Sequence, residues 1–231
     1  MNPNPPGLAM IFDLDGVLIH SMPLHVLAWQ AYLGQLGLPA CADLEARMHG
    51  KRNLELVRDL IDPLITDDAA SWHGAAKEQL FREMLAREGV NKYQVPGLAG
   101  FLEKYKNIPK AIGSNAEPAN IAFVLEHFAL RPYFQAVVNG LEVIRPKPFP
   151  DIYLEAASRL GAPPERCIVF EDSPTGVEAA RAAGMRVVGV ETTPTEFIGV
   201  DLEINDFHDP RLEPWLARQI GAPSATAGYH P

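Results

Sequence analysis

Two aspartates that could do chemistry, Asp13 and Asp15, directly follow a short apolar run over residues 8–12, and Gly16 comes next. The run predicts a buried strand. Because side chains alternate along a strand, both carboxylates should project to the same side at its carboxyl end, where Gly16 permits a turn. Ligands of open α/β sheets bind beyond the carboxyl ends of the strands. The pair could therefore supply a nucleophile and an acid/base beside a divalent metal; the plainer alternative is a pair of turn-capping aspartates.

Further polar residues follow other predicted strands. Ser114 and Asn115 come after one apolar run, and Glu171 and Asp172 come after a later one. Lys147 lies between two prolines in a loop that precedes a predicted helix. A single serine in such a place is usually a helix cap, and a single loop lysine is usually solvated. The ordered series of carboxylate pair, hydroxyl, lysine and carboxylate pair instead predicts one site at the edge of one sheet.

Alternating strands and helices position these residues. This alternation predicts an α/β fold with a parallel, doubly wound sheet. Residues 20–92 carry only helical patterns, so we expect a helical cap inserted after the first strand and lying over the carboxyl edge of the sheet. Ser21, followed by Pro23, should cap the first cap helix. Strands are expected at 8–12, 109–113, 136–138, 167–170, 186–190 and 201–204. The expected divisions are a core at 8–19 and 93–221, a cap at 20–92, a disordered tail at 1–7 and a flexible tail at 222–231.

Composition limits the possible partners. The 231 residues carry a net charge of −9, which argues against general binding of nucleic acids or anionic membranes. Apolar residues make up 47% of the chain, which is enough for a sizeable core, but no apolar run reaches membrane-spanning length. The two cysteines form no zinc-type cluster. Since there is no signal-peptide pattern either, we expect a cytoplasmic protein. No strand edge or apolar stripe beyond the core signals predicts a dimer, so we expect a monomer.

Four ordered segments resemble the haloacid dehalogenase superfamily, in the branch that includes β-phosphoglucomutase and the small sugar-phosphate phosphatases. They are Phe-Asp-Leu-Asp-Gly-Val-Leu at 12–18, Gly-Ser-Asn at 113–115, Arg-Pro-Lys-Pro at 145–148 and Phe-Glu-Asp-Ser-Pro at 170–174. The similarity spans about residues 8–207. It implies a Rossmann-like parallel sheet with an inserted all-helical cap domain, in agreement with the pattern of elements.

The resemblance also implies an aspartyl-phosphate mechanism. Asp13 would attack phosphorus, and Asp15 would protonate the leaving oxygen and then deprotonate the next nucleophile. Mg²⁺, which prefers hard oxygen ligands, would be held by Asp13, the backbone carbonyl of Asp15, Asp172 and, directly or through water, Glu171. The remaining implied contacts to the phosphoryl group and substrate are Ser114, Lys147, Asn115 and the backbone amides of Leu14 and Asp15.

The cap should decide which group accepts the phosphoryl group. His25, Gly50, Lys51, Arg52 and Lys77 are the candidate cap contacts to the substrate. His25 could equally be a packed core histidine, and the basic loop residues could simply be solvated.

Three positions depart from the mutase pattern. With the chain aligned on Gly50, Asn53 stands where mutases place an arginine for the distal phosphate, and Glu117 stands where they place a lysine. His20 replaces the usual aspartate or asparagine. We therefore expect a Mg²⁺-dependent phosphatase of small phosphomonoesters, with sugar phosphates as the expected class. A β-phosphoglucomutase-like isomerase is the alternative. A 2-haloacid dehalogenase and a non-catalytic binding protein are remoter, because halide displacement needs no metal and no core motif is broken.

Overall fold

The computed structural model describes residues 7–48, 51–88, 92–192 and 196–221. A parallel sheet of six strands, in the order β3-β2-β1-β4-β5-β6, forms its centre. The predicted fold class is confirmed, and each strand lies where the sequence predicts one. The expected tails fall outside the described residues, apart from Gly7. The strands are β1 (Ala9–Phe12), β2 (Lys110–Ser114), β3 (Ala136–Asn139), β4 (Cys167–Glu171), β5 (Arg186–Val190) and β6 (Leu202–Ile204).

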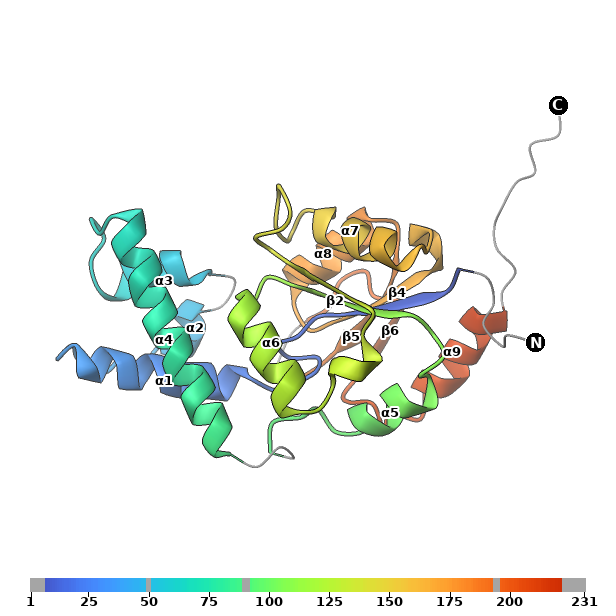
Figure 1. Cartoon of the computed structure of the whole chain (residues 1–231), viewed down its shortest axis with the longest axis horizontal. Coiled ribbons are helices and arrows are strands. Elements are labelled where there is room, and N and C mark those ends of the chain that lie inside the picture. Colours follow the sequence, from blue (N-terminus) through green and yellow to red (C-terminus); the bar gives the residue numbers. More distant parts are fainter. Residues whose placement is uncertain (1–6, 49–50, 89–91, 193–195, 222–231) are drawn as a thin grey trace.

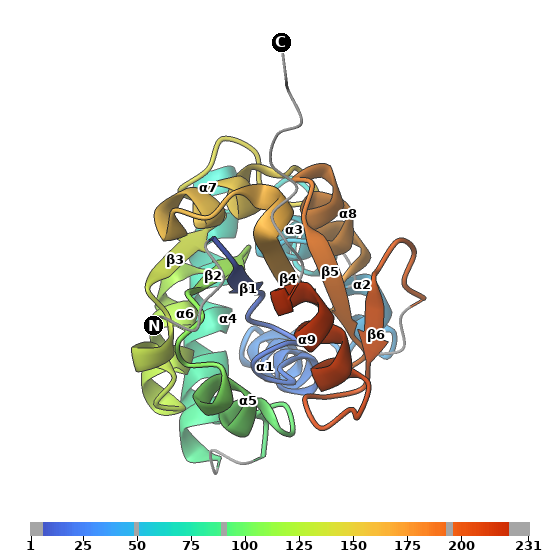
Figure 2. The same ribbon diagram turned by 90° about the vertical axis from the view of Figure 1, so that its right-hand side faces the viewer.

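Alternation along β1 divides the core between the two faces of the sheet. Met10 and Phe12 belong to one apolar cluster, and Ala9 and Ile11 belong to another. Residues of α5, α6 and α9 pack into the first cluster and residues of α7 and α8 into the second, so the sheet lies between two helical layers (Figure 2). These elements are α5 (Leu98–Lys104), α6 (Pro118–His127), α7 (Asp151–Leu160), α8 (Pro174–Ala182) and α9 (Leu212–Gly221), with short 3₁₀ turns at Arg131–Tyr133 and Pro164–Arg166.

Four helices between β1 and α5 form a separate layer beside one end of the sheet (Figure 1). They pack around their own apolar cluster, which includes Trp29, Tyr32 and Val57. Pro63 lies in the connection between the third and fourth of these helices. This layer is called the cap below, and its helices are α1 (Met22–Gln35), α2 (Leu44–Met48), α3 (Asn53–Leu60) and α4 (Asp67–Arg87).

Ser21 does not cap α1, contrary to the expectation from sequence. It occupies the N-cap position, but its side chain accepts no hydrogen bond from the helix. Its hydroxyl instead donates to Asp15 Oδ1 over 2.6 Å. A bond to an ionised acceptor is stronger than one from a neutral amide, and Pro23 removes one of the helix amides that a cap would serve.

The two chain segments that join the cap to the core lie side by side. Ile19 forms a β-bridge with Gln94, and two backbone hydrogen bonds flank it. His20 N donates to Tyr93 O over 2.7 Å, and Val95 N donates to Leu18 O over 3.1 Å. The cap therefore leaves and re-enters the core at one place, a few residues beyond Asp15.

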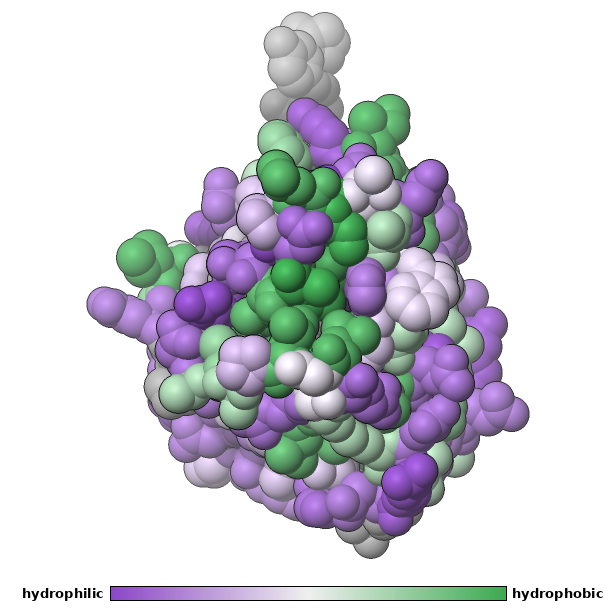
Figure 3. Space-filling view, turned by 90° about the vertical axis from the view of Figure 1, so that its left-hand side faces the viewer, coloured by the Kyte–Doolittle hydropathy of each residue, from purple (hydrophilic) through white to green (hydrophobic). Residues whose placement is uncertain are grey.

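The outer end of the cap carries apolar side chains. Figure 3 shows hydrophobic residues gathered on this face of the molecule. The large apolar side chains exposed on the cap are Leu27, Leu36, Leu64 and Trp72. None of the helices in the described part of the chain is both long enough and apolar enough to cross a membrane.

Candidate active site

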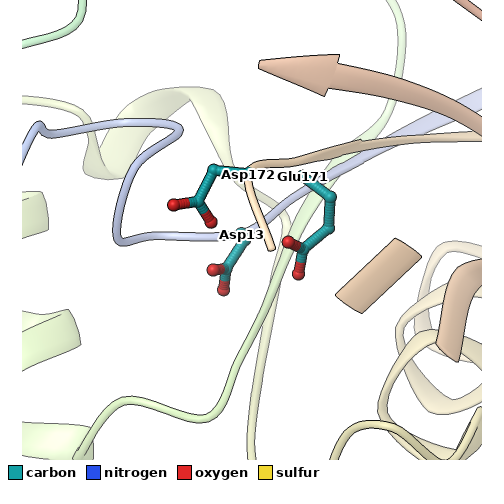
Figure 4. A group of neighbouring side chains, drawn as sticks. All are labelled: Asp13, Glu171 and Asp172. Carbon is teal, nitrogen blue, oxygen red and sulfur yellow. The ribbon is translucent and has the colours of Figure 1, made fainter. Parts of the chain in front are cut away.

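Pairing of β1 with β4 brings the two acidic motifs together. Phe12 and Phe170 are register partners, so Asp13 and the pair Glu171–Asp172 emerge side by side at the carboxyl edge. Figure 4 shows the three carboxylates around a common space, and one oxygen from each lies within 4.8 Å of the others. Gly16 has a φ of +72°, and a Cβ there would lie 1.9 Å from Asp172 Oδ2. Only glycine therefore allows this close approach.

Burial and the crowding of negative charge raise the pKa values of two carboxylates in this cluster. Burial raises the pKa of Asp13 to about 7, although Lys147 opposes the shift. Burial and the charges of Glu171 and Asp13 raise the pKa of Asp172 well above its ordinary value. A bound cation would offset both effects. Three converging carboxylates under mutual repulsion therefore fit a hard divalent cation such as Mg²⁺.

Lys147 is the cation that the structure places in this cluster. Its Nζ lies 3.0 Å from Asp13 Oδ1 and 2.6 Å from Glu171 Oε1. Only 4% of its side chain is exposed. Burial alone would lower the pKa of the lysine, but the two carboxylates raise it above the ordinary value. Lys147 is thus a buried, charged lysine beside Asp13 and not a solvated loop residue.

Glu171 holds Lys147 in place and is itself held by two groups that sequence reasoning did not identify. Tyr153 of α7 donates its hydroxyl to Glu171 Oε1 over 2.7 Å. The backbone N and Oγ of Ser173 both donate to Oε2, each over 2.9 Å. Burial would raise the pKa of Glu171, but Lys147 and these hydrogen bonds keep it below the ordinary value. Nothing in the sequence distinguishes Tyr153 from a core aromatic residue on the buried face of a helix.

Asp15 faces the cap instead of the carboxylate cluster. Its Oδ1 accepts the Ser21 hydroxyl, and His25 Nε2 lies 3.7 Å away. Burial would raise the pKa of Asp15, but the neighbouring His25 and Ser21 lower it below the ordinary value. Thr192 donates its hydroxyl to Gly16 O over 2.8 Å and so ties the segment after β5 to the same turn. Ser21 is the N-cap residue of α1 and His25 lies within α1, so the first helix of the cap layer orients this acid.

The motif after β2 reaches the same edge of the sheet. Ser114 is 2% exposed, and its Oγ accepts a hydrogen bond from Ala116 N over 3.2 Å. Asn115 Oδ1 accepts from Lys147 N over 3.4 Å, which links this motif to the lysine loop. Leu14, which lies between the two aspartates, is fully buried in the core.

Two of the predicted cap contacts lie next to Asp15, and two lie on the surface of the cap. Lys77 is 2% exposed and lies 3.0 Å from His25 Nδ1, so both belong to the site wall next to Asp15. Lys51 pairs with Asp59 over 2.8 Å, and Arg52 pairs with a glutamate of its own helix, both on the surface of the cap. Gly50 lies outside the described residues.

Sequence reasoning also missed Glu78, which contacts both the cap and the core. It is 4% exposed, and it binds Lys77 Nζ over 2.6 Å. Asn53 of the cap and Asn120 of α6 each donate to it over 2.7 Å. Burial would raise the pKa of Glu78, but the charges of Lys77 and His25 and the hydrogen bonds lower it to about 2. An acidic residue on an otherwise ordinary helix gave no sequence signal for this position.

Comparisons with known proteins agree with this geometry. A family model for haloacid dehalogenase-like hydrolases matches residues 8–184. The chain is 33% identical over 184 residues to the fructose-1-phosphate phosphatase YqaB of Escherichia coli, covering 78% of this chain and 95% of the relative. It is 30% identical over 211 residues to the β-phosphoglucomutase of Bacillus subtilis, covering 89% and 92%.

A solved structure shows the same fold. The HAD hydrolase of family IA, variant 3, from Entamoeba histolytica superposes with a TM-score of 0.79 at 29% identity, covering 87% of this chain and 94% of that one. The resemblance expected from four short motifs is therefore confirmed. The chain belongs to the haloacid dehalogenase-like hydrolase family.

Proposed function

We propose that the protein is a Mg²⁺-dependent phosphatase of small phosphomonoesters, in particular sugar monophosphates, and that Asp13 is its nucleophile. The observation that carries this proposal is the buried ion pair of Lys147 and Asp13, 3.0 Å apart, beside Glu171 and Asp172. Two relatives, a fructose-1-phosphate phosphatase and a phosphorylated carbohydrates phosphatase, support the substrate class.

Asp13 and Asp15 divide the chemistry between them. A carboxylate oxygen of Asp13 attacks phosphorus, and the bond from phosphorus to the leaving oxygen breaks. Asp15 is ionised in the free protein, takes up a proton when the anionic phosphate binds beside it, and gives that proton to the leaving oxygen, so the alcohol leaves uncharged. Water then attacks the aspartyl-phosphate, Asp15 accepts the proton of that water, and phosphate is released. Lys147 and Ser114 stabilise the negative charge that develops on the phosphoryl oxygens.

The acidic cluster would hold the cation. Asp13 and Asp172 offer carboxylate oxygens, Asp15 offers its backbone carbonyl, and Glu171 would contribute through water because protein donors occupy both of its oxygens. When bound, Mg²⁺ lowers the electrostatic barrier between the anionic nucleophile and the anionic phosphate. The residues themselves fix the orientation of Asp13 and keep Lys147 charged beside it.

The proposal is tested with an activated aryl phosphate, Mg²⁺ and the purified chain. Phosphate release that EDTA abolishes and Mg²⁺ restores is expected, and Asp13→Asn should abolish it because an amide is a poor nucleophile. Glu45→Gln, a charge change on the cap surface, is the matched control and should retain full activity. Turnover at the wild-type rate by Asp13→Asn would refute the assignment, and chloride release from a 2-haloacid without metal would point to a dehalogenase.

Phosphosugar isomerisation is the second candidate, because the β-phosphoglucomutase relative covers most of both chains. A phosphorus NMR time course with β-glucose 1-phosphate and a trace of the 1,6-bisphosphate separates the two activities. Accumulation of free phosphate without glucose 6-phosphate supports the phosphatase. Conversion to the 6-phosphate, with phosphate conserved in the ester pool, identifies a mutase.

A further inference from the structure

A buried series of polar side chains runs from Asp15 into the boundary between cap and core. His25 Nε2 lies 3.7 Å from Asp15 Oδ1, and His25 Nδ1 lies 3.0 Å from Lys77 Nζ. Lys77 in turn lies 2.6 Å from Glu78 Oε1. The ammonium is therefore already paired with a carboxylate at hydrogen-bond distance, so its charge is largely neutralised before any ligand arrives.

Helix α6 closes this series from the core side. Asn120 donates to Glu78, and Asn53 donates both to Glu78 over 2.7 Å and to Glu117 Oε1 over 3.4 Å. Glu117 occupies the N-cap position of α6. It comes three residues after Ser114 and therefore lies at the carboxyl edge of the sheet, on the same side as Asp13. The boundary beyond Asp15 thus contains two carboxylates from different layers of the molecule.

Glu117 is compensated less fully than Glu78, because within the described residues Glu78 has direct ion pairs and Glu117 has none. Glu117 is half-buried, and in the part of the chain that the structure describes its carboxylate accepts one hydrogen bond, the long one from Asn53. Burial and the charge of Glu78 raise its pKa above the ordinary value, although the Asn53 hydrogen bond and the more distant charges of Lys77 and Arg82 oppose the shift. Lys51 and Arg52, the other candidate cations of the cap, pair with acidic residues of the cap itself.

From this arrangement, and resting on the proposed phosphatase function, we infer that Glu117 selects an uncharged polyhydroxyl leaving group and rejects a second phosphate. Ionised carboxylates only accept hydrogen bonds, so Glu117 suits sugar hydroxyls, which donate them. A second phosphate would meet like charge there, and juxtaposed like charges exclude the wrong partner. The substrates are then monophosphates of neutral polyols, and bisphosphates are poor substrates.

The test compares kcat/KM for matched pairs, fructose 1-phosphate with fructose 1,6-bisphosphate and glucose 1-phosphate with glucose 1,6-bisphosphate. For the sugar whose monophosphate is the better substrate, the wild-type kcat/KM should be about tenfold or more higher for the monophosphate than for the bisphosphate. Glu117→Lys should reduce that ratio by about tenfold or more, and Glu117→Gln should reduce it by less. Glu126→Lys makes the same charge change on an exposed position of α6 and should leave the ratio and the turnover unchanged.

The outcomes separate the inference from the function on which it rests. The inference fails, and the phosphatase function stands, if the aryl phosphate is hydrolysed but the wild type turns over the monophosphate and the bisphosphate of a pair equally. The same conclusion follows if the aryl phosphate is hydrolysed but none of the sugar monophosphates is. An unchanged ratio in both Glu117 variants also overturns it. If the aryl phosphate is not hydrolysed with Mg²⁺, the proposed function itself is wrong. The wild-type ratio needs no variant, so a poorly folded Glu117→Lys does not prevent a decision.

Discussion

Replacing Glu78 by glutamine should cost stability in a way that depends on pH. Glu78 has a folded-state pKa of about 2 against an ordinary value of 4.5, because Lys77, His25 and two asparagines stabilise its ionised form. That difference, at about 1.4 kcal/mol per pH unit, corresponds to about 3 kcal/mol. Loss of one partner from a buried ion pair independently suggests about 3–5 kcal/mol, since Lys77 would remain buried without its carboxylate. At pH 7 we therefore expect Glu78→Gln to lower the free energy of unfolding by about 3 kcal/mol.

The sign of the pH dependence follows from the lowered pKa. A carboxyl group with a depressed folded pKa stabilises the protein above its unfolded pKa of 4.5, and that stability is lost as the pH falls from 4.5 towards 2. By pH 3.5, about 1.4 kcal/mol of the difference between wild type and Glu78→Gln should have disappeared. Urea unfolding at pH 7, 5 and 3.5 measures this difference, with Glu45→Gln on the exposed surface of α2 as control. A difference that stays constant between pH 7 and 3.5 would refute the assigned ion pair.

Three further predictions concern the site itself. Asp15→Asn should slow hydrolysis of an alkyl phosphate by about 10²–10⁴-fold and that of an aryl phosphate far less, because an activated leaving group needs no proton; equal losses on both would contradict the acid role. Asp172→Ala should raise the Mg²⁺ concentration that gives half-maximal activity, and a superimposable metal titration would remove Asp172 from the metal site. Tyr153→Phe removes the hydroxyl that donates to Glu171 and should lower the free energy of unfolding by about 1–2 kcal/mol in a thermal or urea titration, whereas unchanged stability would show that the bond contributes nothing.

The sequence predicts which strand ends form the site because the positions of the strands depend on local patterns. The apolar run before Asp13 and the run before Glu171 each read as buried strands, and parallel pairing then places their carboxyl ends together. Lys147 joins them because its loop follows β3, another strand of the same parallel sheet, and so leaves the sheet at the same edge. These features need only strand periodicity and chain order, and so they could be deduced without coordinates.

The contacts that set the side chains could not be predicted in the same way. Tyr153 and Glu78 lie on helices, where their types are compatible with a core aromatic residue and a solvated glutamate. Their roles depend on how helices from different layers pack, since Glu78 meets Asn120 across the boundary between cap and core. Ser21 was wrongly predicted for the same reason, because a helix cap is a local rule and its bond to Asp15 is a tertiary contact.

The two chain segments that join the cap to the core lie side by side, and this makes the cap a separate module of the molecule. Because Leu18 and His20 hydrogen-bond to Val95 and Tyr93 on either side of the Ile19–Gln94 bridge, the cap begins and ends at one point of the core. Cap residues can then be exchanged or reshaped without altering strand order or the acidic cluster. Substitutions in the cap can therefore change the recognised compound while the core and its acidic cluster stay the same.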